Sequence, residues 1–152
     1  MKLLFENWRK YLNEQYETKD TGIVYTALIL DDPSALVSEL KKQGVEVPKD
    51  WTGLPGLPHH MTIIRPPDQK HRYPARYLNQ QGTATITGYA IDDQVLAVAV
   101  RTDLPTKQII PHITIAVSPT GHAKDSNELL ATSEITDLIP FTVSGIVKEV
   151  TR

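Results

Sequence analysis

The stretch Pro58-His59-His60-Met61-Thr62-Ile63 returns further along the chain as Pro111-His112-Ile113-Thr114-Ile115. Both copies hold a His-x-Thr core in which the residue after the histidine and the residue after the threonine are apolar. The chain has 5 histidines in 152 residues, so a single core of this kind would be weak evidence. Two matched copies in apolar surroundings are much harder to attribute to chance, and they direct attention to these two segments.

Both copies are predicted to be β-strands, in which residues i and i+2 point to the same face. His60 and Thr62 would then share one face while Met61 packs into the core. His112 and Thr114 would share a face in the same way. If the two strands lie near a twofold axis, their imidazoles converge across a cleft.

The segments around the two copies predict an α+β fold in one domain over residues 21–152. Asp32-Pro33 is typical of a helix start, and this helix should run to Gly44. Pro140 precedes the last predicted strand, while residues 68–76 form a polar loop that could enter a short helix through Gln81. The other expected elements are strands at 22–30, 60–65, 82–91, 94–102, 109–118 and 141–150, an irregular loop at 48–58 and a capped short helix at 125–130.

Composition narrows the possible functions. The formal net charge is −2 at pH 7, which argues against binding to a long nucleic-acid duplex. The absence of cysteine excludes a disulfide framework, a thiolate zinc site and a cysteine nucleophile. No apolar stretch is long enough to span a membrane, and we expect a cytoplasmic protein. Residues 1–20 are an expected N-terminal segment whose positions 3–17 form an amphipathic helix; this helix either docks on the domain or binds a protein partner through residues 1–17.

Two imidazoles beside one phosphorus atom suit phosphodiester hydrolysis without a metal or another cofactor. A neutral imidazole can take a proton from the attacking water, and a protonated one can give a proton to the leaving oxygen. The hydroxyls of Thr62 and Thr114 can donate hydrogen bonds to the non-bridging oxygens. The sequence leaves open which histidine acts as the acid and which acts as the base.

With its two His-x-Thr motifs, the chain resembles the 2H phosphoesterases over roughly residues 23–150. The resemblance implies a bilobal α+β fold, with two antiparallel sheets around a central cleft and flanking helices. It also implies that His60 and His112 are the catalytic pair and that Thr62 and Thr114 contact the phosphate. Members of this family act on RNA ends, 2′,3′-cyclic phosphates and cyclic oligonucleotide signals. His59 departs from the motif, because the residue two positions further on is Met61.

Further candidate substrate contacts lie outside the motifs. Tyr25 lies in a strand that also looks family-like, and Lys124 follows the second motif closely. Trp51 either stacks on a base or plugs the core beneath its proline-rich loop. Arg65 could steady the phosphate, and Tyr73 belongs to a loop that alternates cations with aromatic rings, a composition suited to phosphate contact and base stacking. Solvent-exposed structural roles are the alternative for both.

Other interpretations of the motifs remain open at this point. The two histidines could be ordinary strand residues with satisfied hydrogen bonds. A zinc site could draw on His59, His60, His112 and His122, although no characteristic ligand spacing is present. The domain could also bind a nucleotide or RNA without hydrolysing it. Because the first residues resemble leaders of tailed-phage proteins, a phage enzyme that degrades cyclic nucleotide signals in the host cytoplasm is a further alternative.

Overall fold

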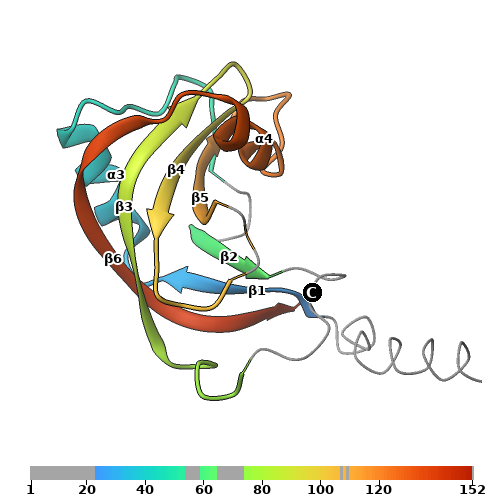
Figure 1. Cartoon of the computed structure of the whole chain (residues 1–152). Coiled ribbons are helices and arrows are strands. Elements are labelled where there is room, and N and C mark those ends of the chain that lie inside the picture. The colour runs from blue at the N-terminus through green and yellow to red at the C-terminus, as the bar shows by residue number, and fades with distance from the viewer. Residues whose placement is uncertain (1–22, 54–58, 65–73, 107, 109, 152) are drawn as a thin grey trace, which may run out of the picture.

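A computed structural model describes residues 23–53, 59–64, 74–106, 108 and 110–151. Within these ranges the chain forms six strands and two helices (Figure 1). In chain order they are β1 (Ile23–Leu30), α3 (Pro33–Lys42), β2 (His60–Ile64), β3 (Gln81–Ile91), β4 (Val95–Arg101), β5 (His112–Val117), α4 (Asp125–Thr132) and β6 (Thr136–Thr151). The α+β class and the six strands are as expected, and none of the described helices is long and apolar enough to cross a membrane.

The strands close into one antiparallel barrel in the order β1-β2-β5-β4-β3-β6, and β6 returns to β1. This differs from the expected pair of separate sheets. The physical reason is β6, which is 16 residues long and pairs with both β1 and β3. A single strand thus carries the hydrogen-bond ladder from one side of the molecule to the other, as its long red ribbon in Figure 1 shows.

The expected start of the last strand after Pro140 was too late, since β6 begins at Thr136. Proline has no amide hydrogen and is tolerated in sheets mainly at edges and bulges. Here Pro140 lies in the stretch of β6 opposite a register shift in β3, between Ile86 and Gly88. The backbone of Ile139, beside it, is paired by a distant side chain: Gln43 donates from Nε2 to its carbonyl at 2.9 Å and accepts its amide at 2.8 Å.

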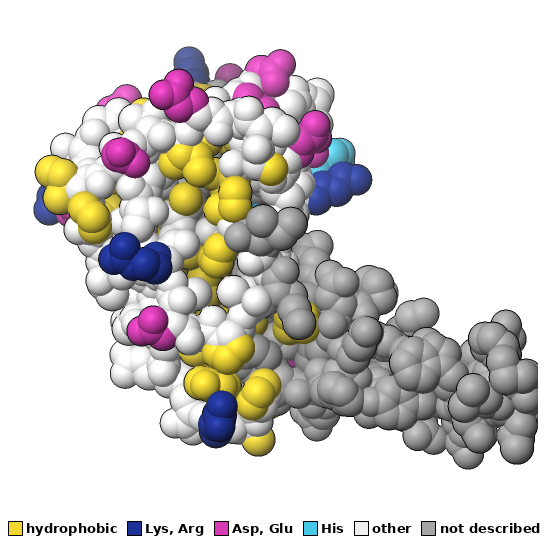
Figure 2. Space-filling model, in the orientation of Figure 1, with side chains coloured by type: hydrophobic (Ala, Val, Ile, Leu, Met, Phe, Trp, Pro, Cys, Tyr) yellow, Lys and Arg dark blue, Asp and Glu magenta, His cyan; other side chains and the backbone are white. Residues whose placement is uncertain are grey.

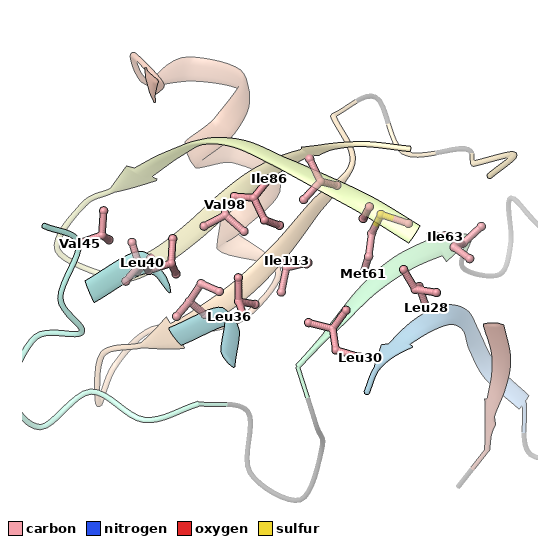
Figure 3. Close-up of a cluster of buried hydrophobic side chains, with 14 of the residues drawn as sticks. Leu28, Leu30, Leu36, Leu40, Val45, Met61, Ile63, Ile86, Val98 and Ile113 are labelled. Carbon is pink, nitrogen blue, oxygen red and sulfur yellow. The ribbon is translucent and has the colours of Figure 1, made fainter. Parts of the chain in front are cut away.

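The barrel interior is the main hydrophobic core, to which every strand and α3 contribute. Figure 3 shows Leu36 and Leu40 of α3 extending toward Val98, Ile113 and the side chains around them. The helix begins as predicted: the Asp32 carboxylate accepts a hydrogen bond from the Ala35 amide at 3.1 Å. The pKa of Asp32 lies below its usual value, chiefly because the Ser34 hydroxyl also donates to it.

A second, smaller cluster lies on the opposite face of β4. Leu96, Val98 and Val100 belong to the main core, whereas the alternating set Val95, Ala97 and Ala99 packs with Leu129 and Leu130 of α4. Both faces of β4 are therefore buried, which explains its continuous apolar sequence. Helix α4 lies on the outside of the barrel over this strand.

The structure differs from the expected helix through Gln81, and it does not describe some of the residues for which the sequence made predictions. The short helix expected through Gln81 is absent, because residues 74–80 form turns and β3 starts at Gln81. The predicted N-terminal segment 1–20, with its helix at 3–17, lies outside the described residues, as do Arg65 and Tyr73.

Candidate active site

The two motif strands are neighbours in the barrel. β2 and β5 run antiparallel, with Met61 opposite Ile113. Continuing this register by one residue in each direction places His60 opposite Thr114 and Thr62 opposite His112. A local twofold axis passing between Met61 and Ile113 relates the two motifs, because a half-turn about it would move His60 onto the position of His112 and Thr62 onto that of Thr114.

All four motif side chains share one face, because successive side chains alternate across a strand. In an antiparallel ladder, directly opposite residues have Cβ atoms about 4.5–5.5 Å apart, and diagonal neighbours are about 7–8 Å apart. His60 and His112 are diagonal neighbours in this register. Each imidazole therefore lies beside the hydroxyl of the other motif, and the diagonal spacing leaves room for a group the size of a phosphate between the rings.

The opposite face of the two strands confirms this alternation. Met61 and Ile113 are fully buried and belong to the main core (Figure 3). The four motif side chains are nearly buried, with His60 7%, Thr62 9%, His112 8% and Thr114 7% exposed. Among the described residues seven polar side chains are buried, and these four account for most of them. Four buried polar side chains on one face cost free energy unless each of them finds a hydrogen-bond partner.

The imidazole of His112 has a defined proton position. Its Nδ1 lies 2.9 Å from the backbone carbonyl of Ile110. A carbonyl oxygen can only accept, so Nδ1 carries the hydrogen and the lone pair of the neutral ring is on Nε2. Nε2 is therefore the atom of His112 that can exchange a proton with a ligand.

The ring of His60 is held by a neighbour on β1. Tyr25 stacks on it, with 5.2 Å between the ring centroids and an angle of 26° between the planes. Tyr25 is itself buried, at 6% exposed. Thus the structure brings Tyr25 to the motif face, as a packing partner of His60. Its predicted contact with a substrate stays a prediction.

The edges of the β2–β5 contact are closed by side chains. At one end His59 donates from Nε2 to the carbonyl of Ile115 at 3.0 Å, which gives this departure from the motif a structural role. At the other end the hydroxyl of Thr106 donates to the Ile63 carbonyl at 2.8 Å. Sequence analysis did not single out Thr106, which lies 43 residues from its partner.

Helix α4 reaches the motif face through Ser126. The hydroxyls of Thr114 and Ser126 are 2.8 Å apart, and Ser126 is fully buried. The predicted helix is present and begins at Asp125 as expected, but it continues to Thr132 and lacks the expected side-chain cap. Lys124 occupies the N-cap position without a side-chain cap, and Asp125 accepts from the His122 amide. The predicted helix at 125–130 includes Ser126, but nothing in the sequence indicated that this residue contacts the second motif.

The remaining candidates are placed as follows. Lys124 is exposed, two residues before Ser126 and thus at the end of α4 nearest the motifs. Trp51 is half-buried and packs against the main core, as in the second of the two interpretations of this residue. Within the part of the chain that the structure describes, no three histidine or carboxylate side chains gather as metal ligands would. Of the other two histidines considered as zinc ligands, His59 is hydrogen-bonded to the Ile115 carbonyl, and His122 is exposed.

Similarity to characterised proteins adds nothing to this geometry: the chain matches no protein-family model and, at a significant level, no curated protein sequence.

Proposed function

We propose that this protein is a phosphodiesterase in which His60 and His112 transfer the protons and Thr62 and Thr114 bind the phosphate. One observation carries the proposal: the antiparallel register of Met61 and Ile113. It places each histidine against the threonine of the other motif on one nearly buried polar face. Two equivalent imidazole–hydroxyl pairs are what an acid, a base and two donors to one phosphate group require.

The proposed reaction is hydrolysis by direct attack of water. One neutral imidazole takes a proton from the water as its oxygen bonds to phosphorus. The bond from phosphorus to the leaving oxygen breaks, and the other, protonated imidazole supplies the proton to that oxygen. The threonine hydroxyls donate to the non-bridging oxygens, whose charge rises in the transition state. The orientation of the substrate decides which histidine acts first.

The β2–β5 contact is also where a division into two lobes would lie. Among the residues that the structure describes, the ladder of this contact holds one residue pair, Met61 with Ile113, and side chains close both of its ends. We place the proposed substrate cleft over this contact, with β1 and β2 on one side and β4 and β5 on the other. Helix α4 then flanks the second side through Ser126.

The proposed substrates are small: a 2′,3′-cyclic phosphate, an RNA end, or a short or cyclic oligonucleotide with 2′–5′ or 3′–5′ linkages. The net charge of −2 provides little attraction for a long polyanion. On the face seen in Figure 2, the described Lys and Arg side chains lie apart from one another instead of in a basic band. Both observations favour substrates that are recognised at the motif face itself.

The direct test is a substrate panel assayed by chromatography. It contains 2′,3′-cyclic mononucleotides, 2′–5′-linked oligoadenylates, and cyclic di- and trinucleotides, each with and without excess EDTA. We expect at least one to be hydrolysed at a rate that EDTA does not change, because imidazoles perform both proton transfers. Activity lost to EDTA and restored by zinc would refute the two-histidine mechanism. Tight binding with no product after long incubation would indicate a non-catalytic binding domain.

The pH dependence gives an independent check. One imidazole must be neutral and the other protonated, so kcat/KM should follow a bell-shaped curve with both limbs set by histidines. Rates measured from pH 4.5 to 9 on the best substrate of the panel would define the two limbs. A curve that rises to a plateau, with no fall on the alkaline side, would show that no protonated histidine is needed.

A further inference from the structure

Ser126 is a fully buried side chain outside the motifs that contacts one of the four motif residues directly. It comes from the first turn of α4, and its hydroxyl is 2.8 Å from that of Thr114. Neither side chain has much access to water, since Ser126 is 0% and Thr114 7% exposed. Whatever directs the Thr114 hydroxyl must therefore be a protein group or the substrate itself.

Two facing hydroxyls share one hydrogen, so one must donate and the other accept. If Thr114 donates to Ser126, the hydrogen of the Thr114 hydroxyl is unavailable to a phosphate. The hydrogen of the Ser126 hydroxyl then lies where neither water nor the phosphate reaches it. If Ser126 donates to Thr114, the Thr114 hydrogen can point to a phosphate oxygen and both hydrogens are used. An anionic ligand at the motif face therefore selects the second direction. A hydroxyl that accepts a hydrogen bond is also polarised by it, so it donates its own hydrogen more strongly than an isolated hydroxyl would.

We infer that Ser126 is a positioning residue, which holds the Thr114 hydroxyl with its hydrogen directed at the substrate phosphate. This inference rests on the proposed function. It assigns α4 a role beyond packing: Leu129 and Leu130 fix the helix on β4, and the same helix delivers Ser126 to β5. The hydroxyl of Thr114 is then oriented before substrate arrives, which lowers the cost of ordering it during the reaction.

The experiment is a double-mutant cycle with Ser126→Ala, Thr114→Val and the double variant. Both substitutions remove a hydroxyl with little change of shape. We expect Ser126→Ala to lower kcat about tenfold in the wild-type background, as the loss of one oriented hydrogen bond would. In the Thr114→Val background the same substitution should leave kcat unchanged, because Ser126 then has no hydroxyl to orient. An equal loss in both backgrounds would overturn the inference, since it would show that Ser126 acts on the fold alone.

Controls separate positioning from stability. Asn127→Ala changes an exposed residue of the same helix and should keep the wild-type kcat. Thermal unfolding establishes that each variant is folded at the assay temperature. If Ser126→Ala is too unstable to assay, Ser126→Cys keeps a weaker donor there and should give an intermediate kcat. A Ser126→Cys rate equal to that of the wild type would contradict the inference.

The cycle also remains informative if the proposed function fails. Should the wild-type chain hydrolyse nothing in the panel, the same four proteins are titrated calorimetrically with inorganic phosphate. The inference would be supported without the catalytic proposal if Ser126→Ala bound phosphate more weakly than the wild type while the double variant bound it as tightly as Thr114→Val alone. Additive losses would overturn it, and a wild-type chain that binds no phosphate would overturn both.

Discussion

His60→Ala and His112→Ala are each expected to lower kcat about 10²–10⁴-fold on the best phosphodiester substrate. Each variant removes one of the two proton transfers while the threonine hydroxyls remain. Because the two histidines act on a single reaction, the double variant should be little slower than the slower single variant. Rates under saturating substrate, with unfolding curves for each variant, provide the measurement.

His122→Ala is the matched control for these variants, because His122 is exposed and lies outside both motifs. It should keep the wild-type rate. His112→Asn tests whether geometry alone explains the loss, since its amide can still donate to the Ile110 carbonyl as Nδ1 does. An active His112→Asn, or a His122→Ala as slow as the motif variants, would contradict the assignment of His112.

Gly145→Ala is expected to produce the largest loss of stability. A Cβ atom at this position of β6 would lie 2.1 Å from the backbone oxygen of Ile29 and 2.7 Å from its carbonyl carbon. Backbone on a paired strand cannot move aside as a flexible side chain can, so the β1–β6 ladder has to shift. We expect a loss of about 3 kcal/mol, at the upper end of what overpacking costs, and a fall in Tm of about 10 °C.

Gly53→Ala is the control for this substitution. Its Cβ would meet His59 Nε2 at 3.6 Å and the Ile115 oxygen at 3.8 Å, which are ordinary contact distances. Its Tm should stay within about 2 °C of the wild-type value, as expected for a substitution that breaks no packing. If Gly145→Ala unfolded at the wild-type temperature, the close approach of β6 to β1 would not exist in solution.

Sequence periodicity predicted the faces of the motif strands because alternation is a local property of extended chain. The i and i+2 relation alone places His60 with Thr62, and it sets Met61 on the core side. The helix after β1 was equally local, since Asp32 and Pro33 specify its first turn. These elements needed no knowledge of distant residues.

The pairing of the motifs could not be predicted in this way. A shift of one residue between β2 and β5 would set the histidines of one strand against the core residues of the other. The observed register is maintained by contacts distant in sequence, including His59 with Ile115 and Thr106 with Ile63. The hydrogen bond between the hydroxyls of Ser126 and Thr114 likewise depends on how α4 packs on β4.

The length of β6 was underestimated for the same reason. A proline such as Pro140 normally ends a strand. Here the strand continues past it because the side-chain amide of Gln43, 96 residues from Ile139, pairs with both backbone polar groups of Ile139. Closure of the barrel depends on β6 pairing on both sides, so the single closed sheet was equally hidden from local patterns.

The pairing of β1 with β6 also has a consequence for how the protein is made. It joins Ile23 to Thr151, so nearly the whole described chain must be synthesised before the barrel can close. Ladders between residues so distant in sequence form slowly, because the entropy of closing a long loop is lost before their contacts are gained. Until β6 leaves the ribosome, β1 has no partner on that side, and the nascent chain exposes an unpaired strand edge next to the strand that bears His60.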